Sequence, residues 1–207
     1  MKARILFLGV MLLIGCMGCK RVQPPVGSAA ADQTLAPTAQ VTSPTPVAPK
    51  GAQGGRTCVQ VVKHQRKLFV WRDGVLQHTF PIGLGFAPEG HKQEEGDGKT
   101  PEGTYYVCTR NNASRYYLSL GLSYPNASDA AAALQRGSIT QREHDAIVCA
   151  INAGQIPPWN TPLGGEIMLH GRGAHRDWTA GCVAVEDVDM DILWALCRIG
   201  TQVFIEP

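Results

Sequence analysis

Charge is scarce in this sequence, and neither sign dominates. Of 207 residues, 19 are Lys or Arg and 17 are Asp or Glu, which leaves a net charge of +2 at neutral pH. Proteins that bind nucleic acids through their phosphates carry a clear basic excess, so the composition argues against that class. The 23 glycines and 14 prolines follow no Gly-X-Y period, which excludes a collagen-like chain.

Long hydrophobic runs are also absent. The most apolar stretch follows Lys2 and Arg4 and covers residues 5–14. A helix that crosses a bilayer needs about 20 apolar residues, so this run is too short. A short apolar run behind basic residues is typical of an export signal. We therefore expect residues 1–15 to be a signal peptide.

The signal ends in Leu13-Ile14-Gly15-Cys16, which resembles the lipobox of bacterial lipoproteins. The resemblance implies that Cys16 is the lipidated first residue of the mature chain and holds it on a membrane. Met17 stands where Asp would follow the cysteine, which implies the outer membrane if the host is Gram-negative. A plain signal peptide cleaved nearby and an uncleaved anchor remain alternatives. The expected location is the cell envelope, lipid-anchored on the periplasmic face.

Residues 16–55 offer little to bury. From residue 21 onward they contain six of the 14 prolines among Ala, Thr, Gln and Ser, without apolar periodicity. This composition is typical of an extended, disordered tether. We expect the tether to carry a domain formed by residues 56–207, which is a normal length for one domain with its own core.

Strand-like runs dominate the expected domain, and it contains no internal repeat. Two β-prone runs flank Asp73-Gly74, a pair typical of a hairpin turn. Further strands are predicted over residues 104–109, 116–124 and 203–205. Helices are predicted over residues 128–135, from Thr140 to a stop by Gly154, and from about Asp187 to a stop before Gly200. The second begins with a capping box, Thr140 and Glu143. The predicted fold is mainly β with a few helices (α+β), as a sandwich or an open barrel.

Two apolar, strand-like runs each adjoin a reactive residue with a glycine next to it. These pairs are His170-Gly171 and Gly181-Cys182. A free thiol, with a pKa of about 8.5, is mostly protonated at neutral pH, and an adjacent imidazole is its usual activator. The pattern predicts thiol acyl transfer with Cys182 as nucleophile and His170 as base. Gly181 is expected to let a substrate backbone come close, and amides around Cys182 can form an oxyanion hole.

Several motifs in order resemble the L,D-transpeptidase catalytic domain family, which has the YkuD fold. They are His170-Gly171, then Thr179-Ala180-Gly181-Cys182-Val183, preceded at residues 96–103 by Gly-Asp-x-x-Thr-Pro-x-Gly. The resemblance covers residues 58–206 and implies a YkuD-like β-sandwich or open barrel that requires no metal or organic cofactor.

Some positions depart from the usual family pattern. Ala180 and Ala184 stand where many members have His and either Arg or Asn, and the interval between His170 and Cys182 is short. This variant is closer to a branch that reads Asp-Trp-Thr-x-Gly-Cys. That branch includes proteins resembling an amidase that detaches lipoprotein from peptidoglycan.

The resemblance implies an acyl-enzyme on Cys182, formed from a peptidoglycan stem tetrapeptide as D-alanine departs, with His170 as base and then acid. A stem amine or a lipoprotein lysine then accepts the acyl group, which defines an L,D-transpeptidase. Acceptance by water gives an L,D-carboxypeptidase, and the amidase remains a further alternative. The alternative from another class is a non-catalytic wall-binding lipoprotein on the same fold. We expect a monomer.

Substrate-binding residues are expected around the two reactive side chains, namely Gly171, Arg172, Arg176, Trp178 and Gly181. Because the usual cation is missing at Ala184, we hypothesise that Arg172, His175 or Arg176 binds the stem carboxylates. Trp178 can stack on substrate or fill the core. Thr179 can orient His170 or only cap a turn. The tyrosines Tyr105, Tyr106, Tyr116 and Tyr117 are expected to be sheet residues rather than ligands.

Cysteines of exported proteins more often form disulfides than act as nucleophiles. Beyond Cys16 and Cys19 the chain has five, an odd number. With Cys182 free, two disulfides in any of three pairings remain open for the other four, Cys58, Cys108, Cys149 and Cys197. Zinc accepts a donor set such as His170, His175 and Cys182, but neither a Cys-x-x-Cys motif nor a clear fourth ligand accompanies them. We therefore expect no metal.

Overall fold

The computed structural model describes residues 46–50 and 56–207. The predicted signal peptide (residues 1–15), the expected lipidation site Cys16 and most of the predicted tether (residues 16–55) lie outside these residues. Within the described ranges, every helix is too short or too polar to cross a membrane.

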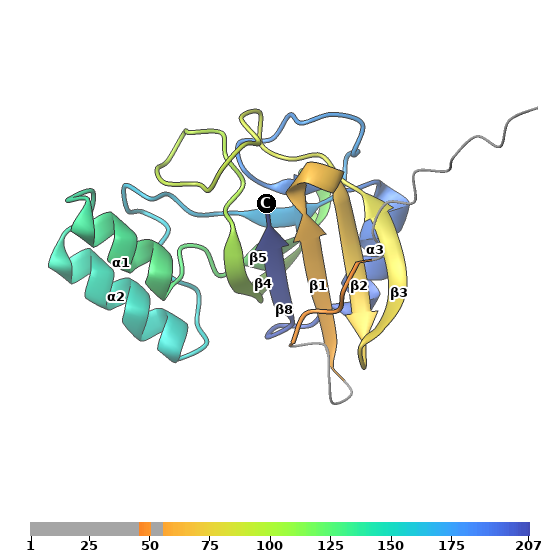
Figure 1. Ribbon diagram of the computed structural model, residues 1–207, viewed down its shortest axis with the longest axis horizontal. Coiled ribbons are helices and arrows are strands. Elements are labelled where there is room, and N and C mark those ends of the chain that lie inside the picture. The colour runs from red at the N-terminus through yellow and green to blue at the C-terminus, as the bar shows by residue number, and fades with distance from the viewer. Residues whose placement is uncertain (1–45, 51–55) are drawn as a thin grey trace, which may run out of the picture. The chain divides into compact units, whose positions relative to one another are not determined.

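One curled sheet organises the described residues (Figure 1). Its eight strands follow the order β3-β2-β1-β8-β4-β5-β6-β7. They are β1 (Thr57–Val62), β2 (Lys67–Arg72), β3 (Val75–Pro81), β4 (Gly103–Ser114), β5 (Tyr117–Leu122), β6 (Met168–His170), β7 (Val183–Ala184) and β8 (Gln202–Glu206). The β1–β8 and β6–β7 pairs are parallel, and the other neighbours are antiparallel. A 3-10 turn, η1 (Lys63–Gln65), joins β1 to β2.

The predicted hairpin around Asp73-Gly74 is confirmed. It joins β2 to β3, with Arg72 paired to Val75 across a two-residue turn. Asp73 has a φ of 53° and Gly74 a φ of 75°, the left-handed conformation at both central positions that matches the twist of the flanking strands. The sequence therefore sets this turn locally.

The curled sheet is closed by a segment that follows β3. Gly83 and Ala184 exchange two backbone hydrogen bonds, of 2.9 and 2.8 Å, and Gly85 forms a bridge to Thr179. These contacts join the β3 side of the sheet to β7, at its other edge. The enclosed core includes Val59, Val70, Leu120, Leu169, Val183 and Val203. The expected mainly β fold with a few helices is confirmed: the sheet curls into a half-barrel, and isolated bridges from the segment after β3 join its edges.

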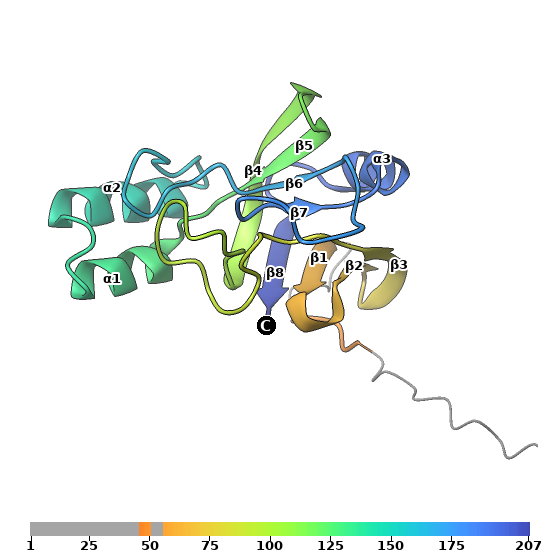
Figure 2. The ribbon, with the colours of Figure 1, turned by 90° about the horizontal axis from the view of Figure 1, so that it is seen from above.

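The three α-helices of the described residues lie in two places (Figures 1 and 2). α1 (Ala127–Gln135) and α2 (Gln141–Asn152) pack on each other at one end of the described domain, around the buried residues Ala130, Ala133 and Ile147. The capping box of α2, Thr140 with Glu143, is confirmed, and Asn126 with Asp129 forms a second box at α1. α3 (Asp187–Leu196) packs on β5 and β6 through Met190 and Leu193, which are buried in the main core.

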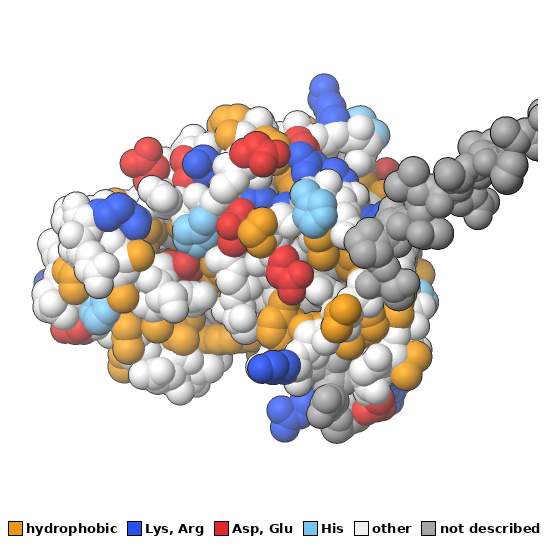
Figure 3. Space-filling model, viewed as in Figure 1, with side chains coloured by type: hydrophobic (Ala, Val, Ile, Leu, Met, Phe, Trp, Pro, Cys, Tyr) orange, Lys and Arg blue, Asp and Glu red, His pale blue; other side chains and the backbone are white. Residues whose placement is uncertain are grey.

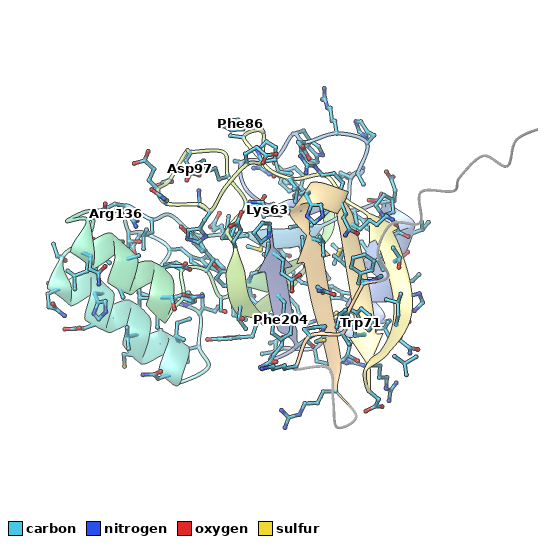
Figure 4. The ribbon with its side chains drawn as sticks, in the orientation of Figure 1. Lys63, Trp71, Phe86, Asp97, Arg136 and Phe204 are labelled. Carbon is cyan, nitrogen blue, oxygen red and sulfur yellow. The ribbon has the colours of Figure 1, made fainter. Side chains whose placement is uncertain are left out.

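A second, smaller apolar cluster lies on the outer face of β1, β2 and β8. Cys58, Val62, Phe69 and Trp71 are buried there, and Phe204 and Ala48 pack against them. Trp71 and Phe204 are labelled in Figure 4. The Trp71 indole N–H donates to Gln60 Oε1 at 3.0 Å, so its polar group is satisfied within the cluster.

The long connection between β3 and β4, residues 82–102, is fixed from below by Lys63 (Figure 4). The Lys63 ammonium is buried and donates to the carbonyls of Gly90 (2.6 Å) and Thr100 (3.1 Å) and to the Glu102 carboxylate (2.7 Å). These bonds use all three donors of the ammonium.

Acidic and basic side chains intermingle over the loops on the upper part of the face in Figure 3.

The five cysteines of the described residues are free thiols, so none of the three disulfide pairings is present. Burial raises the pKa of Cys58 and Cys108 to about 11 and that of Cys197 to about 12. Cys149 is exposed on α2. The three buried thiols are therefore protonated at neutral pH and behave as small apolar side chains.

Lys63→Met tests how strongly the buried ammonium holds the β3–β4 connection. The change leaves two carbonyls and a carboxylate without their donor, so we expect a loss of about 2–3 kcal/mol in the free energy of unfolding. Urea titration measures it. Lys67→Met is the matched control, because the Lys67 side chain makes no hydrogen bond or ion pair with the described residues. Equal stabilities of the two variants would contradict the assignment.

Candidate active site

Adjacent parallel strands bring the two predicted catalytic residues together (Figure 2). Leu169 of β6 pairs with Val183 of β7, and His170 pairs with Ala184. Leu169 and Val183 belong to the main core. Side chains alternate between the two faces of a strand, so His170, which follows Leu169, and Cys182, which precedes Val183, both point away from the main core. Both line one cleft of about 930 Å³.

The turn before Cys182 is held on its other side by the segment that closes the sheet. The amides of Trp178 and Thr179 both donate to the carbonyl of Leu84, at 3.0 and 3.1 Å. The amide of Leu84 donates to Asp177 Oδ1 at 2.9 Å. Asp177 also forms an ion pair with Arg66, at 2.9 Å. The segment that bears the cysteine is therefore fixed from two directions.

Gly181 is required by packing rather than by substrate access. It has a φ of 132°, and a methyl group on its Cα would lie 2.7 Å from the carbonyl oxygen of Lys99. The space beside this glycine, which the sequence suggested for a substrate backbone, is filled by the backbone of the chain itself. Gly181 is buried and is not among the residues that line the cleft.

Thr179 caps the turn around the cysteine. Its hydroxyl donates to the carbonyl of Cys182 at 2.7 Å and accepts from the amide of Gly181 at 3.1 Å. The hydrogen bond of His170 goes to the carbonyl of Gly171 instead. Of the two roles that the sequence left open for Thr179, these bonds favour turn capping.

The hydrogen bond of His170 fixes its tautomer. Nδ1 lies 2.7 Å from the carbonyl oxygen of Gly171, and because a carbonyl only accepts, Nδ1 must carry the proton. The lone pair of the neutral ring is then on Nε2. His170 is only 2% exposed, and burial lowers the pKa of its imidazole, with the bond to Gly171 acting in the opposite direction. His170 is therefore neutral, as a base must be, at neutral pH.

Cys182 is also neutral at rest. Its Sγ accepts from the amide of Met168 at 3.4 Å and lies 3.5 Å from the carbonyl of Glu166, to which the thiol donates. Burial raises the pKa of the thiol, while the Met168 amide and the positive charge of Lys92 lower it in part. A thiol with a raised pKa needs a general base before it can attack. The neutral imidazole of His170 lines the same cleft and is the candidate for that base.

Four parts of the chain form the walls of the cleft. They are the β4–β5 hairpin, the stretch leading into β6, the loop around residues 92–96, and the segment around residues 178–182 that precedes β7. The residues used below are Lys92, Glu95, Arg115, Tyr116, Glu166, His170, Trp178, Thr179 and Cys182. The sequence-predicted residues Gly171, Arg172, Arg176 and Gly181 are not among the lining residues.

Aromatic rings surround His170. Tyr116 stacks on the imidazole with ring centres 4.7 Å apart and an angle of 26°, and Trp178 approaches it edge-on at 5.6 Å. Trp178 is half-buried, and its indole N–H donates to the carbonyl of Gly173 at 3.2 Å. The expectation that Tyr116 is a sheet residue is wrong, because it lies in the turn between β4 and β5. Its ring instead packs on the candidate base.

The structure does not place Arg172, His175 or Arg176, the cations expected to bind the stem carboxylates, among the residues that line the cleft. Arg172 and His175 line a separate cavity of about 460 Å³ beside the start of α3. The basic residues that line the cleft are Lys92 and Arg115. Sequence reasoning missed both of them, because they lie about 90 and 67 positions before the cysteine.

Lys92 is held by the loop that contains Asp97, which is labelled in Figure 4. Its buried ammonium donates to the carbonyl of Glu94 at 2.8 Å and to Asp97 Oδ1 at 2.9 Å. Asp97 also accepts three backbone amides, and the pKa of its carboxyl is lowered because these bonds and Lys92 outweigh its burial. The Gly-Asp motif of the sequence thus positions a fixed positive charge near Cys182.

The zinc donor set considered from the sequence is not assembled. His175 lines the separate cavity, whereas His170 and Cys182 line the cleft. Over residues 46–50 and 56–207, no group of three or more His, Cys, Asp or Glu side chains is placed to hold a metal ion.

Comparison with known proteins identifies the class. Residues 56–205 match the family model described as the L,D-transpeptidase catalytic domain, YkuD. The chain therefore belongs to the L,D-transpeptidase catalytic domain family, as its motifs suggested.

Two similar proteins illustrate the range of the family. The putative L,D-transpeptidase YafK of Escherichia coli K12 is 34% identical over 99 residues, which are 43% of this chain and 40% of that protein. The crystal structure of the helical cell shape determining protein Pgp2 (K307A mutant) from Campylobacter jejuni is 22% identical, with a TM-score of 0.50, over 73% of this chain and 47% of the other. The second likeness supports the shared fold. The chain spans less than half the length of each of these two proteins.

Gly181→Ala tests the packing role of the glycine before the cysteine. Both the positive φ and the clash with Lys99 oppose the added methyl, so we expect a loss of about 3 kcal/mol or more in the free energy of unfolding. Gly154→Ala is the control, because Gly154 also has a positive φ, of 66°, but open space around it. We expect it to lose only about 1–2 kcal/mol. If the two losses measured by urea titration were equal, the clash would contribute nothing.

Proposed function

We propose that this protein is a cysteine acyltransferase of the L,D-transpeptidase type that acts on peptidoglycan stem peptides. One observation carries the proposal. Cys182 and His170 leave adjacent parallel strands on the side of one cleft, and the Gly171 carbonyl holds the histidine in the tautomer whose Nε2 can accept the thiol proton.

The proposed reaction has two steps. His170 Nε2 takes the proton of Cys182 while the sulfur adds to the carbonyl between the third and fourth residues of the stem. The C–N bond then breaks, Nε2 gives its proton to the amine of the departing D-alanine, and a thioester remains on Cys182. An acceptor amine gives a proton to His170 and displaces the sulfur, which forms the new amide and restores the thiol.

The charges of the cleft suit a zwitterionic peptide. Lys92 and Arg115 supply positive charge, and Glu95 and Glu166 supply negative charge, within one cavity. A stem peptide carries carboxylates and, on its diamino acid, an amine. This complementarity supports peptidoglycan as substrate class, whether the acceptor is a stem amine, a lipoprotein lysine or water.

The proposal extends to the location. A lipid anchor at Cys16, followed by the Pro-rich tether, would hold the domain on the periplasmic face of the envelope within reach of the cell wall. Because Cys16 lies outside the described residues, this part of the proposal rests on the sequence resemblance alone.

The test uses the full chain in detergent. It is incubated with a disaccharide tetrapeptide and, separately, with a lipoprotein-linked muropeptide, and the products are identified by mass spectrometry. We expect D-alanine release with formation of cross-linked dimers. We expect Cys182→Ala to lose the activity and His170→Asn to lose about 100- to 10,000-fold of it, while Cys149→Ala, which removes an exposed thiol on α2, keeps it.

Other products would assign a different function. D-alanine release without dimers would make water the acceptor, and release of the lipoprotein fragment would make the protein an amidase. Absence of any Cys182-dependent product from either substrate would contradict the proposal and leave a non-catalytic wall-binding lipoprotein.

The pH profile tests the state of the base. Because burial lowers the pKa of His170, the imidazole stays unprotonated to a lower pH than an exposed histidine. We therefore expect kcat/KM for D-alanine release to persist as the pH falls through the ordinary histidine value of about 6.5 and to decline only below it. Circular dichroism at each pH checks that the chain stays folded. A half-maximal rate above pH 6.5 would contradict the assigned environment of His170.

A further inference from the structure

The direction of proton transfer fixes where the departing residue must lie. In the proposed reaction, the proton taken by His170 is delivered to the amine that leaves. The departing residue therefore occupies the part of the cleft nearest His170, and the acyl portion occupies the opposite part. What lines the His170 side of the cleft then determines which departing residues are accepted.

The His170 side is formed by the turn between β4 and β5. Ser119 of β5 pairs with His170 of β6, so the hairpin lies directly beside the candidate base. The Tyr116 ring stacks on the imidazole. Tyr117 donates its hydroxyl to Asp191 of α3 at 2.9 Å, which ties the turn to the body of the domain. The turn is therefore a fixed wall of the cleft.

Arg115 supplies an unpartnered positive charge at this wall. The centre of its guanidinium lies 4.8 Å from the centre of the Tyr116 ring, which holds it by a cation–π contact. The side chain lines the cleft, is exposed, and makes no hydrogen bond or ion pair with any described residue. Its five N–H donors are thus available, in the planar geometry that binds a carboxylate through two parallel hydrogen bonds.

The other charged residues of the cleft, Lys92, Glu95 and Glu166, differ from Arg115. The ammonium of Lys92 already donates to Glu94 and Asp97. Glu166, which belongs to the stretch leading into β6, acts on the Cys182 thiol and would repel a carboxylate placed beside it. A free carboxylate on the substrate therefore finds its best partner at Arg115, next to His170.

We propose that Arg115, resting on Tyr116, binds the free α-carboxylate of the departing residue, so that the cleft prefers donors whose terminal carboxylate is free. This inference rests on the proposed function for the identity of the departing residue. D-alanine meets the requirement, because its amine and its carboxylate are attached to the same carbon. A donor whose last carboxylate is amidated lacks the group that Arg115 binds.

The test compares a tetrapeptide acid with its C-terminal amide, using the full chain. We expect the wild type to prefer the acid, in kcat/KM, by about tenfold or more, since hydrogen bonds to a charged group contribute about that factor. Arg115→Met should reduce kcat/KM for the acid by a similar factor, mainly through KM, and leave the amide almost unchanged. Arg115→Lys should restore part of the preference. Arg142→Met, an exposed arginine on α2, should change neither value.

Binding to Cys182→Ala separates this inference from the proposed function. We expect calorimetry to show tighter binding of the acid than of the amide, and Arg115→Met in the same background to remove the difference. If the wild type turned over neither peptide, the proposed function would fail, while an Arg115-dependent binding preference would still support the carboxylate site. Equal handling of acid and amide by the wild type and equal binding to Cys182→Ala would overturn the inference. Equal losses of kcat/KM for the acid and for the amide in Arg115→Met would also overturn the inference, because they would indicate a merely structural role of Arg115.

Discussion

The backbone pairing of Gly83 with Ala184 bridges the two edges of the curled sheet, and the position of the candidate nucleophile, Cys182, depends on it. One edge of the short β7 strand pairs with β6, which carries His170, and the other edge pairs with this closing segment. Hydrogen bonds hold this strand on both edges, so they fix the backbone beside Cys182 relative to the strand that carries the histidine. Glycine is needed in this region: a methyl group on Gly83, Gly85 or Gly181 would lie within 2.7 Å of a backbone carbonyl oxygen.

Burial sets the chemistry that this position allows. It lowers the pKa of His170 and raises that of Cys182, so both groups are neutral in the resting protein. In the reaction proposed above, a neutral pair requires proton transfer during attack rather than an ion pair formed beforehand, and the tautomer of His170 leaves Nε2 free to accept that proton. Lys92, held in place by Asp97, partly offsets the effect of burial on the thiol.

The sequence predicts local features well and non-local ones poorly. The Asp73-Gly74 hairpin, the Thr140 capping box and the α3 helix are determined by neighbouring residues, and all three are present. The placement of β8 between β1 and β4 depends on contacts between distant segments, and no local pattern reports it. The same limit applies to the site. Cys182 and His170 are conspicuous in sequence because glycine stands beside each, whereas Arg115 and Lys92 reach the cleft only through the folding of remote loops.

The central claim is that Cys182 is a nucleophile activated within this cleft. It is tested most directly by the intact mass of the full chain after treatment with a carbapenem, followed by peptide mapping of the modified residue. The account predicts one added drug mass, located on Cys182, in the wild type, with almost none in His170→Asn and none on the exposed Cys149. An unmodified Cys182 in the folded wild-type chain would contradict it.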